Sequence, residues 1–452
     1  MGLLGARHPA RLVAAGFALA VVVGTAVLML PIATESGEST SAVTALFTAT
    51  SAVCVTGLVV VDTGSHWSMF GELTILTLIQ VGGLGIMTLA SMLGLIVARR
   101  MGLRMQLVAQ AETRSVQLGD SRRVVIGVIV LSLAVEAVIA AILSTRFIVG
   151  YDENVGRGIY LGIFHAISAY NNAGFSLYAD SLMPFASDLW ILVPIVVGFV
   201  IGGLGFPVVF EAYRRLLRRL RSATAPARGW SLHTKITVIT YAILAVAGAV
   251  AITAAEWSNP ATLGPMGLVD KVTNGVFQGM SPRTVGFNSI DIGAMHPSSL
   301  LVTDMLMFIG GGSAGTAGGI KVTTFALLAF VVIAEIRGEP TVHVMGRNLA
   351  PTVQRQAITV VLLGVGAVVA STLAIMFMTE YRLETVLFEV VSAFATVGLS
   401  TGITADLPAG AQLLLVLLMF VGRLGPITLA TALALRERGR RYEYPEERPI
   451  VG

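Results

Sequence analysis

Residues 388–402, FEVVSAFATVGLSTG, form a stretch that recurs in four versions along the chain. Each version begins with phenylalanine, has a serine four residues later, and reaches a glycine after 9 or 10 residues, followed by leucine or phenylalanine. Successive glycines are 117, 112 and 112 residues apart, so the unit is about a quarter of the chain. A unit repeated four times predicts a quasi-fourfold fold. The other versions are residues 47–59 (FTATSAVCVTGLV), 164–177 (FHAISAYNNAGFSL) and 277–290 (FQGMSPRTVGFNSI).

The composition indicates a membrane protein. Of 452 residues, 55% are hydrophobic and 12% are charged, and the mean hydropathy is +0.82, whereas charged residues make up about 25% of soluble domains. The first apolar stretch, residues 12–33, follows basic residues and lacks a small-residue cleavage site clear of its apolar core. We therefore expect a retained helix and not a signal peptide. Cys54 is the only cysteine, which excludes an intrachain disulfide or a cysteine-based metal site.

Helix-length apolar runs predict eight membrane spans. A shorter apolar run, of about ten residues, lies between the two spans of each repeat, and a run of this length cannot cross a hydrocarbon core of ~30 Å. We expect it to be a re-entrant half-helix. The spans are expected near residues 12–33, 70–98, 124–146, 189–211, 236–256, 303–335, 357–379 and 412–435, and the half-helices near 42–52, 160–169, 269–280 and 385–394.

Each repeat then consists of a span, a half-helix, a loop and a second span. The fold class expected is an all-α polytopic membrane protein with four pseudo-symmetric repeats around a central pore, as in potassium channels. The repeats are expected at residues 1–104, 105–222, 223–341 with a Gly-rich loop at 310–319, and 342–452 with a short cytoplasmic tail.

The charges agree with a topology that has both termini in the cytoplasm. Lys and Arg then divide as 23 cytoplasmic, 5 external and 2 within spans, as the positive-inside rule requires. The acidic residues divide as 16 external, 9 cytoplasmic and one, Glu136, within a span. An external face rich in carboxylates concentrates cations at its mouth. The sequence therefore favours a cation over an anion as the permeant ion.

The loop after each half-helix has the properties of an ion selectivity filter. Glycine permits backbone conformations in which consecutive carbonyl oxygens face one way, and four such loops can replace the water shell of a cation. The two residues before each glycine differ between repeats, which backbone coordination tolerates and side-chain chelation does not. The predicted potassium-binding residues are Val55, Thr56, Gly57, Asn172, Ala173, Gly174, Thr284, Val285, Gly286, Thr396, Val397 and Gly398.

The sixth span contains a glycine-rich stretch, residues 310–319 (GGGSAGTAGG). Each glycine costs a helix interior roughly 1 kcal/mol relative to alanine, so we expect the span to break there into two half-helices. A loop at this place lies beneath the filter, and we interpret it as a gate, with passive close packing as the alternative. Its residues are Gly310, Gly311, Gly312, Ser313, Ala314, Gly315, Thr316, Ala317, Gly318 and Gly319, followed by Lys321.

Two nucleotide-binding motifs of soluble proteins are partly matched in this stretch, but neither predicts a nucleotide site here. Residues 310–315 match G-x-G-x-x-G, but no strand precedes them and they lie within an apolar span. Lys321 is followed by Val322, so the Walker pattern also fails.

The residues resemble the Trk/Ktr/HKT superfamily of potassium transporters over essentially the whole chain. The most specific matches are VCVTGL around Gly57, SPRTVGFN around Gly286 and ATVGLSTG around Gly398, together with the glycine-rich stretch and Arg423. With eight spans and no additional N-terminal pair, the chain is most similar to the Ktr membrane subunit.

The resemblance implies potassium uptake, stimulated by sodium, by a homodimer in the cytoplasmic (inner) membrane with one pore per protomer. It also implies a cytoplasmic ring of nucleotide-binding, RCK-type regulatory subunits. Nucleotide would then bind to that partner, and neither a cofactor, a metal nor nucleic acid is expected on this chain. A serine at the first filter glycine accompanies sodium preference in the plant branch, so Gly57 points to potassium. Cys54 and the pair Asn171 and Asn172 depart from the pattern, which leaves a sodium-permeable member of the superfamily as an alternative.

Arg423 lies within the eighth span, where a charge costs at least about 2.5 to 3.5 kcal/mol and is usually functional or paired. By position and by resemblance we assign it to the inner pore, where it limits occupancy or pairs with the gate loop; a structural salt bridge is the alternative. Lys321 is expected to extend toward the cytoplasm. Glu389 and its counterparts Thr48, His165 and Gln278 are expected to orient the half-helices.

Glu136 is expected to pair with a polar neighbour, and the basic run at residues 214–221 is expected to meet lipid headgroups. An alternating-access symporter would favour inverted repeats and ionisable residues at the midplane, whereas these four repeats run in one direction. An intramembrane enzyme would need a nucleophile with a base, or a metal set, at one depth, and neither is evident. A pore explains the fourfold glycines, which the other two classes leave without a role.

Overall fold

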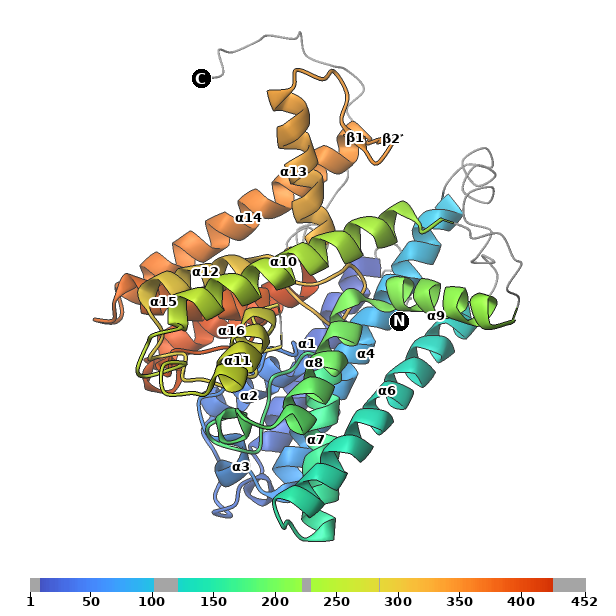
Figure 1. The fold of residues 1–452 in the computed structure, drawn as a ribbon. Helices are drawn as coiled ribbons and strands as arrows, with labels where there is room; N and C mark the ends of the chain where they lie inside the picture. The colour runs from blue at the N-terminus through green and yellow to red at the C-terminus, as the bar shows by residue number, and fades with distance from the viewer. Residues whose placement is uncertain (1–8, 101–120, 222–228, 284, 426–452) are drawn as a thin grey trace, which may run out of the picture.

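The computed structural model describes residues 9–100, 121–221, 229–283 and 285–425, and nearly all of the secondary structure is α-helical (Figure 1). The predicted repeat boundaries at 104/105 and 222/223 lie outside these residues, and the division into four repeats stays a prediction there. The long helices are α1 (Pro9–Leu28), α4 (Met69–Arg100), α6 (Ser121–Gly150), α8 (Leu189–Leu204), α9 (Phe206–Arg221), α10 (Leu232–Glu256), α12 (Pro297–Phe308), α13 (Val322–Ile336), α14 (Pro351–Met376) and α16 (Ala409–Leu424).

Four further helices occupy the places predicted for the half-helices. They are α2 (Ala42–Val53), α7 (Val155–Tyr170), α11 (Leu268–Met280) and α15 (Leu383–Ala395). The remaining elements are small: α3 (Thr63–His66), the 3₁₀ turns η1 (Pro31–Ala33), η2 (Met183–Phe185) and η3 (Thr404–Asp406), and an antiparallel hairpin of β1 (His343–Val344) and β2 (Arg347–Asn348). This hairpin lies with α13 at one end of the molecule, where α13 packs against α10 and α14 (Figure 1).

The helices close into a ring. Within a repeat, the half-helix packs against the long helices around it, as α2 does against α1 and α4 and α7 does against α6 and α8. Between repeats, the second long helix of one repeat packs against the half-helix of the next. These contacts join α4 to α7, α8 to α11, α12 to α15 and, closing the circle, α16 to α2.

The half-helices lie at the centre of the fold, as the burial of their phenylalanines shows. Phe47, Phe164, Phe277 and Phe388, the first residues of the four repeated stretches, are each at most 1% exposed. The outer helices instead expose apolar side chains such as Leu19 and Ile243, as expected for surfaces that face lipid. The predicted all-helical membrane fold is confirmed.

The eight predicted spans stay a prediction, because several of the helices concerned adjoin residues that the structure does not describe. Within the part of the chain that the structure describes, three helices are long and apolar enough to cross a membrane: Val124–Gly150, Leu232–Glu256 and Pro351–Met376. The number is four if α8 and α9, which meet at an angle of 106°, count as one broken span. Shorter apolar stretches lie in α1 (Ala14–Leu28), α4 (Met69–Gly85) and α16 (Ala409–Leu424), next to residues that are not fully described. The glycine-rich stretch separates α12 from α13.

The bend between α8 and α9 was not predicted, and it lies at Gly205. This residue has a left-handed φ of 88°, and a Cβ on it would lie 2.5 Å from the carbonyl oxygen of Ser313. A residue with a side chain would be strained at this φ and would clash with this carbonyl oxygen. The bend therefore depends on the close approach of a loop from the third repeat.

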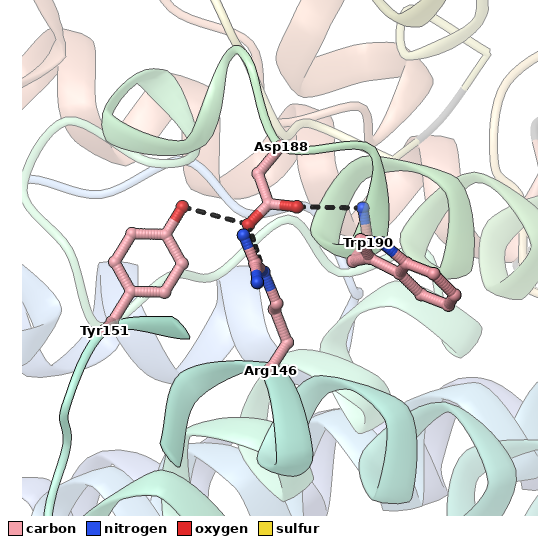
Figure 2. Close-up of polar contacts among 4 residues, drawn as sticks. All are labelled: Arg146, Tyr151, Asp188 and Trp190. Atoms are coloured by element: carbon pink, nitrogen blue, oxygen red, sulfur yellow. Dashed lines mark hydrogen bonds and ion pairs between the residues drawn. The ribbon is translucent and has the colours of Figure 1, made fainter. Parts of the chain in front are cut away.

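A polar cluster fastens α6 to the start of α8 (Figure 2). Asp188 accepts hydrogen bonds from the backbone nitrogen of Trp190 (2.9 Å) and from the Tyr151 hydroxyl (3.0 Å), and it pairs with Arg146 Nε at 2.6 Å. It thus caps the N-terminus of α8, where a negative charge is favourable. Burial and the hydrogen bond to Asp188 raise the pKa of Tyr151 to about 12.

Candidate ion pathway

Each half-helix ends in a tight turn built on the serine of the repeated stretch. In three repeats, the backbone nitrogen five residues after this serine donates to its carbonyl oxygen, and in the third repeat the donor is four residues away. The pairs are Thr56 to Ser51 (2.7 Å), Ala173 to Ser168 (2.8 Å), Val285 to Ser281 (3.1 Å) and Val397 to Ser392 (2.9 Å).

The serine hydroxyls hold the next part of the loop. Ser51 and Ser392 accept from the backbone nitrogens of Gly57 and Gly398, both at 3.1 Å. Ser168 donates to the carbonyl oxygen of Phe175 at 2.8 Å, and Ser281 donates to that of Phe287. The serine was noted in the sequence as part of the repeat, but this role in fixing the loop was not predicted.

The backbone of these loops, here called the signature loops (residues 55–57, 172–174, 284–286 and 396–398), is left-handed at the four glycines and at the first residue of the three loops whose first residue is described. The first residues Val55, Asn172 and Thr396 have φ of 56°, 59° and 50°, and the glycines Gly57, Gly174, Gly286 and Gly398 have φ of 91°, 69°, 78° and 97°. Left-handed φ at a non-glycine residue is costly and marks a functional or tightly constrained segment.

The four signature glycines lie against one another in a closed circle. A Cβ on Gly57 would lie 2.3 Å from the carbonyl oxygen of Ala173, and each further glycine meets the loop of the following repeat in the same way. The corresponding distances are 2.4 Å from Gly174 to Val285 O, 2.3 Å from Gly286 to Val397 O and 2.1 Å from Gly398 to Thr56 O. No residue with a side chain fits this approach without displacing the backbone.

Eight of the twelve predicted filter residues, the glycine and the residue before it in each loop, therefore come together, and Thr284 lies outside the described residues. The C-termini of α2, α7, α11 and α15 lead directly into the circle. The C-terminal end of a helix carries about half a negative charge. Both the carbonyl oxygens and the helix ends thus favour a cation near the axis.

The stretch between α12 and α13, residues 309–321 and here called the Gly-rich loop, is non-helical as predicted. Its base is closed by hydrogen bonds from Gly310 N to Ile320 O (2.9 Å) and from Val322 N to Gly311 O (3.0 Å). Its middle crosses to the second repeat, where Gly312 N donates to Gly203 O at 2.7 Å and Thr316 N donates to Gly202 O at 3.1 Å.

The Gly-rich loop also touches two signature loops. The Thr316 hydroxyl donates to the Asn172 side-chain oxygen at 2.9 Å. On the other side, a Cβ on Gly318 would lie 1.9 Å from the Thr396 hydroxyl oxygen and 2.6 Å from the carbonyl oxygen of Ala395. The loop therefore reaches from the second signature loop to the fourth.

Arg423 links the Gly-rich loop to the first repeat. Its side chain is 4% exposed. One guanidinium nitrogen donates to the carbonyl oxygen of Thr316, and the other donates to that of Gly82 on α4 at 3.3 Å. Arg423 thus contacts the loop, as one of the two predicted roles requires, through backbone carbonyls and not through an acidic partner.

Lys321 contacts the Gly-rich loop, and its extension toward the cytoplasm stays a prediction. Its ammonium group donates to the carbonyl oxygen of Ala317, within the Gly-rich loop. A short return to a carbonyl of the preceding turn satisfies the charge where Lys321 begins α13.

Arg283 is a buried cation that the charge count had placed on the external face. It is 1% exposed, and its guanidinium lies 3.9 Å from the ring centroid of Tyr241. It donates to the carbonyl oxygens of Tyr241 (2.9 Å) and Gly310 (3.3 Å). Arg283 therefore joins the third signature loop to α10 and to the first residue of the glycine-rich stretch. Its position three residues before Gly286 was the available signal.

The polar residues after the signature phenylalanines behave differently from one another. Glu389 accepts from the Ser400 hydroxyl (2.7 Å), the Thr401 nitrogen (2.9 Å) and the Thr404 hydroxyl (2.8 Å), so it fixes the chain beyond the fourth signature loop. His165 lies 3.1 Å from the Ser176 hydroxyl. The polar atoms of Thr48 and Gln278 are buried with no hydrogen-bond partner among the described residues.

Glu136 pairs with polar neighbours, as predicted. Gln80 donates to both of its carboxylate oxygens at 3.1 Å, and Asn171 donates to one of them at 3.2 Å and to Gln80 at 2.8 Å. The network connects α4 and α6 to the end of α7. Within the described residues, no group of three or more His, Cys, Asp or Glu side chains could hold a metal ion.

Comparisons with known proteins agree with this architecture. The model of the TrkH family, described as a cation transport protein, matches residues 7–443. The chain is 37% identical over 444 residues to the Ktr system potassium uptake protein B of Bacillus subtilis, covering 98% of this chain and 97% of that protein. It is 33% identical over 453 residues to the potassium/sodium uptake protein NtpJ of Enterococcus hirae, covering 98% and 97%.

A solved structure is also similar. The crystal structure of the potassium transporter TrkH from Vibrio parahaemolyticus superposes with a TM-score of 0.73 at 19% sequence identity, covering 96% of this chain and 86% of that one. At this identity the likeness concerns the fold alone.

Proposed function

This chain belongs to the TrkH family of cation transport proteins, and from that premise we propose that it takes up potassium across the cytoplasmic membrane through a filter of backbone carbonyls. The observation that carries the proposal is the closed circle of Gly57, Gly174, Gly286 and Gly398, each packed against a carbonyl group of the following repeat. Four equivalent segments around one axis can replace the hydration shell of a cation with carbonyl oxygens. The names of the relatives from B. subtilis and E. hirae support potassium, and the second also supports a sodium-permeable variant.

The Gly-rich loop is the proposed gate. It crosses from Asn172 to Thr396, the first residues of two signature loops, and it is built mostly of small residues with few side-chain anchors. A segment held by a few backbone hydrogen bonds can leave at a cost much smaller than that of unfolding a helix. Arg423, which donates to Thr316 O, is proposed to hold the loop in place from the inner side of the pore.

Control by a cytoplasmic nucleotide-binding subunit, and assembly as a homodimer, are further parts of the proposal. The B. subtilis relative is named as protein B of a Ktr system, which supports a partner subunit. In this chain, α13 follows the Gly-rich loop directly and lies with the β1–β2 hairpin at one end of the molecule (Figure 1). A partner that moves α13 would therefore act on the loop without an intermediate element.

Uptake of rubidium into proteoliposomes tests the filter. We expect saturable uptake that potassium inhibits and sodium inhibits weakly, and we expect Gly286→Ser to abolish this preference because its side chain meets Val397 O. Gly338→Ser is the matched control, since Gly338 also has a positive φ, 65°, but nothing lies within 4 Å of its Cβ position. Equal uptake and selectivity in both variants would reject the filter and favour an alternating-access symporter.

A further inference from the structure

Helix α9 is a strongly amphipathic helix that runs across the end of α8. The two helices meet at 106°, so α9 cannot continue α8 through the membrane and instead runs nearly perpendicular to it (Figure 1). Its sequence, FPVVFEAYRRLLRRLR, places apolar residues three and four positions apart and collects the arginines on the other side. This pattern is typical of helices that lie in a membrane interface.

One edge of the apolar face has no protein cover. Tyr213, Leu216 and Leu220 are 56%, 56% and 75% exposed. They adjoin a groove of about 420 Å³ that Val209, Tyr213, Arg215, Leu216, Arg219 and Trp230 line. The guanidinium of Arg215 lies 5.3 Å from the ring centroid of Trp230. The groove thus combines an apolar wall for an acyl chain, two cations for a phosphate, and an indole, which is enriched at membrane interfaces.

The charge of α9 is strongly positive where it meets this groove. Glu211, its only acidic residue, faces the start of α10, where it accepts from Ser231 N (2.8 Å), Ser231 Oγ (2.7 Å) and Thr234 Oγ1. That carboxylate therefore caps another helix and anchors α9, and it is not directed at the groove. The positive-inside topology puts this end of the molecule at the cytoplasmic leaflet, whose anionic lipids attract such arginines.

We propose that the α9 groove binds an anionic phospholipid of the cytoplasmic leaflet, with its phosphate at Arg215 and Arg219 and an acyl chain along Val209, Tyr213 and Leu216. Charge complementarity and the continuity of α9 with an apolar helix select a lipid over a soluble anion.

Occupancy of this groove acts on the Gly-rich loop. Gly202 and Gly203, whose carbonyl oxygens accept from Thr316 N and Gly312 N, lie at the end of α8, and α9 begins one residue after Gly205. A lipid that fixes α9 therefore fixes the acceptors that hold the loop. This second step rests on the proposed function of the loop as a gate, whereas lipid binding itself does not.

Quenching of tryptophan fluorescence by brominated lipids tests binding. The purified full chain is placed in bilayers that contain brominated phosphatidylglycerol or brominated phosphatidylcholine at equal mole fraction, and the signal of Trp230 is the difference between the wild type and Trp230→Phe. We expect at least twofold stronger quenching by phosphatidylglycerol, and loss of this excess in the double variant Arg215→Gln/Arg219→Gln. The double variant Arg157→Gln/Arg382→Gln, which removes the same charge from exposed sites elsewhere, keeps the excess.

Equal quenching by the two lipids, or an excess that survives Arg215→Gln/Arg219→Gln, would overturn the site. If that variant instead lost the capture of a purified regulatory subunit while its lipid contact was unchanged, the face would be a protein docking surface and the lipid proposal would fail.

Rubidium uptake in liposomes with increasing phosphatidylglycerol tests the coupling. We expect uptake by the wild type to change severalfold and that by Arg215→Gln/Arg219→Gln to stay constant. Selective quenching together with uptake that does not depend on lipid composition would overturn only the coupling between lipid binding and the Gly-rich loop. Absence of uptake in every lipid and variant would count against the proposed function, and the quenching result would still decide the site.

Discussion

Gly398 and Thr56, 342 positions apart in the chain, meet at the point where the circle of signature loops closes. A Cβ on Gly398 would lie 2.1 Å from the carbonyl oxygen of Thr56 and 3.0 Å from the Cα of Gly57. The last repeat thus packs against the first at a position that has no room for a side chain. The other neighbouring repeats pack against one another in the same way. Four segments that are far apart in the sequence thus surround one axis.

Gly398→Ala should impair ion selectivity. The methyl group must displace the Thr56 carbonyl, and alanine at a φ of 97° adds strain of about 1–3 kcal/mol. A difference of about 1.4 kcal/mol between potassium and sodium occupancy is a tenfold change in preference, so we expect at least that loss in competition of rubidium uptake by the two ions. Gly402→Ala, at the same φ with nothing within 4 Å of its Cβ position, serves as the control. Unchanged selectivity in Gly398→Ala would contradict the filter.

Arg423→Gln should raise basal flux several-fold. The variant removes a fixed positive charge beside the axis and the bridge between Thr316 O and Gly82 O. Arg423→Lys separates these two effects, because lysine keeps the charge but lacks the planar fork that reaches two carbonyls. We expect Lys to give intermediate flux in proteoliposomes. Wild-type flux in Arg423→Gln would show that the residue has a structural role alone.

Deletion of residues 313–317 should also raise basal flux through a purified subunit. The deletion removes Thr316, which contacts Gly202 O and Asn172, and it leaves the base of the loop intact, where Gly310 pairs with Ile320 and Val322 pairs with Gly311. Elution volume and thermal stability establish that the variant is folded. Flux that is unchanged or lower in a folded deletion would argue against the gate.

The sequence allowed the half-helices, the signature loops and the broken sixth span to be predicted, because each depends on local properties. An apolar run of ten residues is too short to cross a membrane, and six glycines in ten positions cannot sustain a helix. The family resemblance added the identity of the fold, which the comparisons confirm. The positions of the signature glycines follow from the repeat itself, whereas their close approaches to the neighbouring loops are seen only in the structure.

What could not be predicted depends on contacts between distant segments. The motif Gly-Gly-Leu-Gly occurs at residues 82–85 and 202–205, yet α4 continues through the first and α8 ends in the second. The difference is Ser313, whose carbonyl oxygen packs against Gly205. The contacts of Arg283 and Lys321 could not be predicted for the same reason, because their partners Gly310 and Ala317 take their positions only when the Gly-rich loop folds.

Arg283 offers the sharpest test of how the third signature loop holds the Gly-rich loop. Its guanidinium stacks on Tyr241 and donates to the carbonyl oxygens of Tyr241 and Gly310. A desolvated cation–π contact contributes about 2 kcal/mol, and each hydrogen bond from a charged group about 1.5–3 kcal/mol. Arg283→Gln should therefore lower the midpoint of thermal unfolding by several degrees and raise basal rubidium flux, because Gly310 loses its donor.

Two changes at Tyr241 separate the ring from the hydroxyl. The Tyr241 hydroxyl is buried with no hydrogen-bond partner among the described residues, so Tyr241→Phe keeps the contact and should leave both stability and flux at wild-type values. Tyr241→Leu removes the aromatic face and should show part of the Arg283→Gln effect. In the double variant Arg283→Gln/Tyr241→Leu the two losses should be less than additive, as expected for residues in contact. Full additivity, or a loss of stability in Arg283→Gln with no change in flux, would show that Arg283 stabilises the fold without holding the loop.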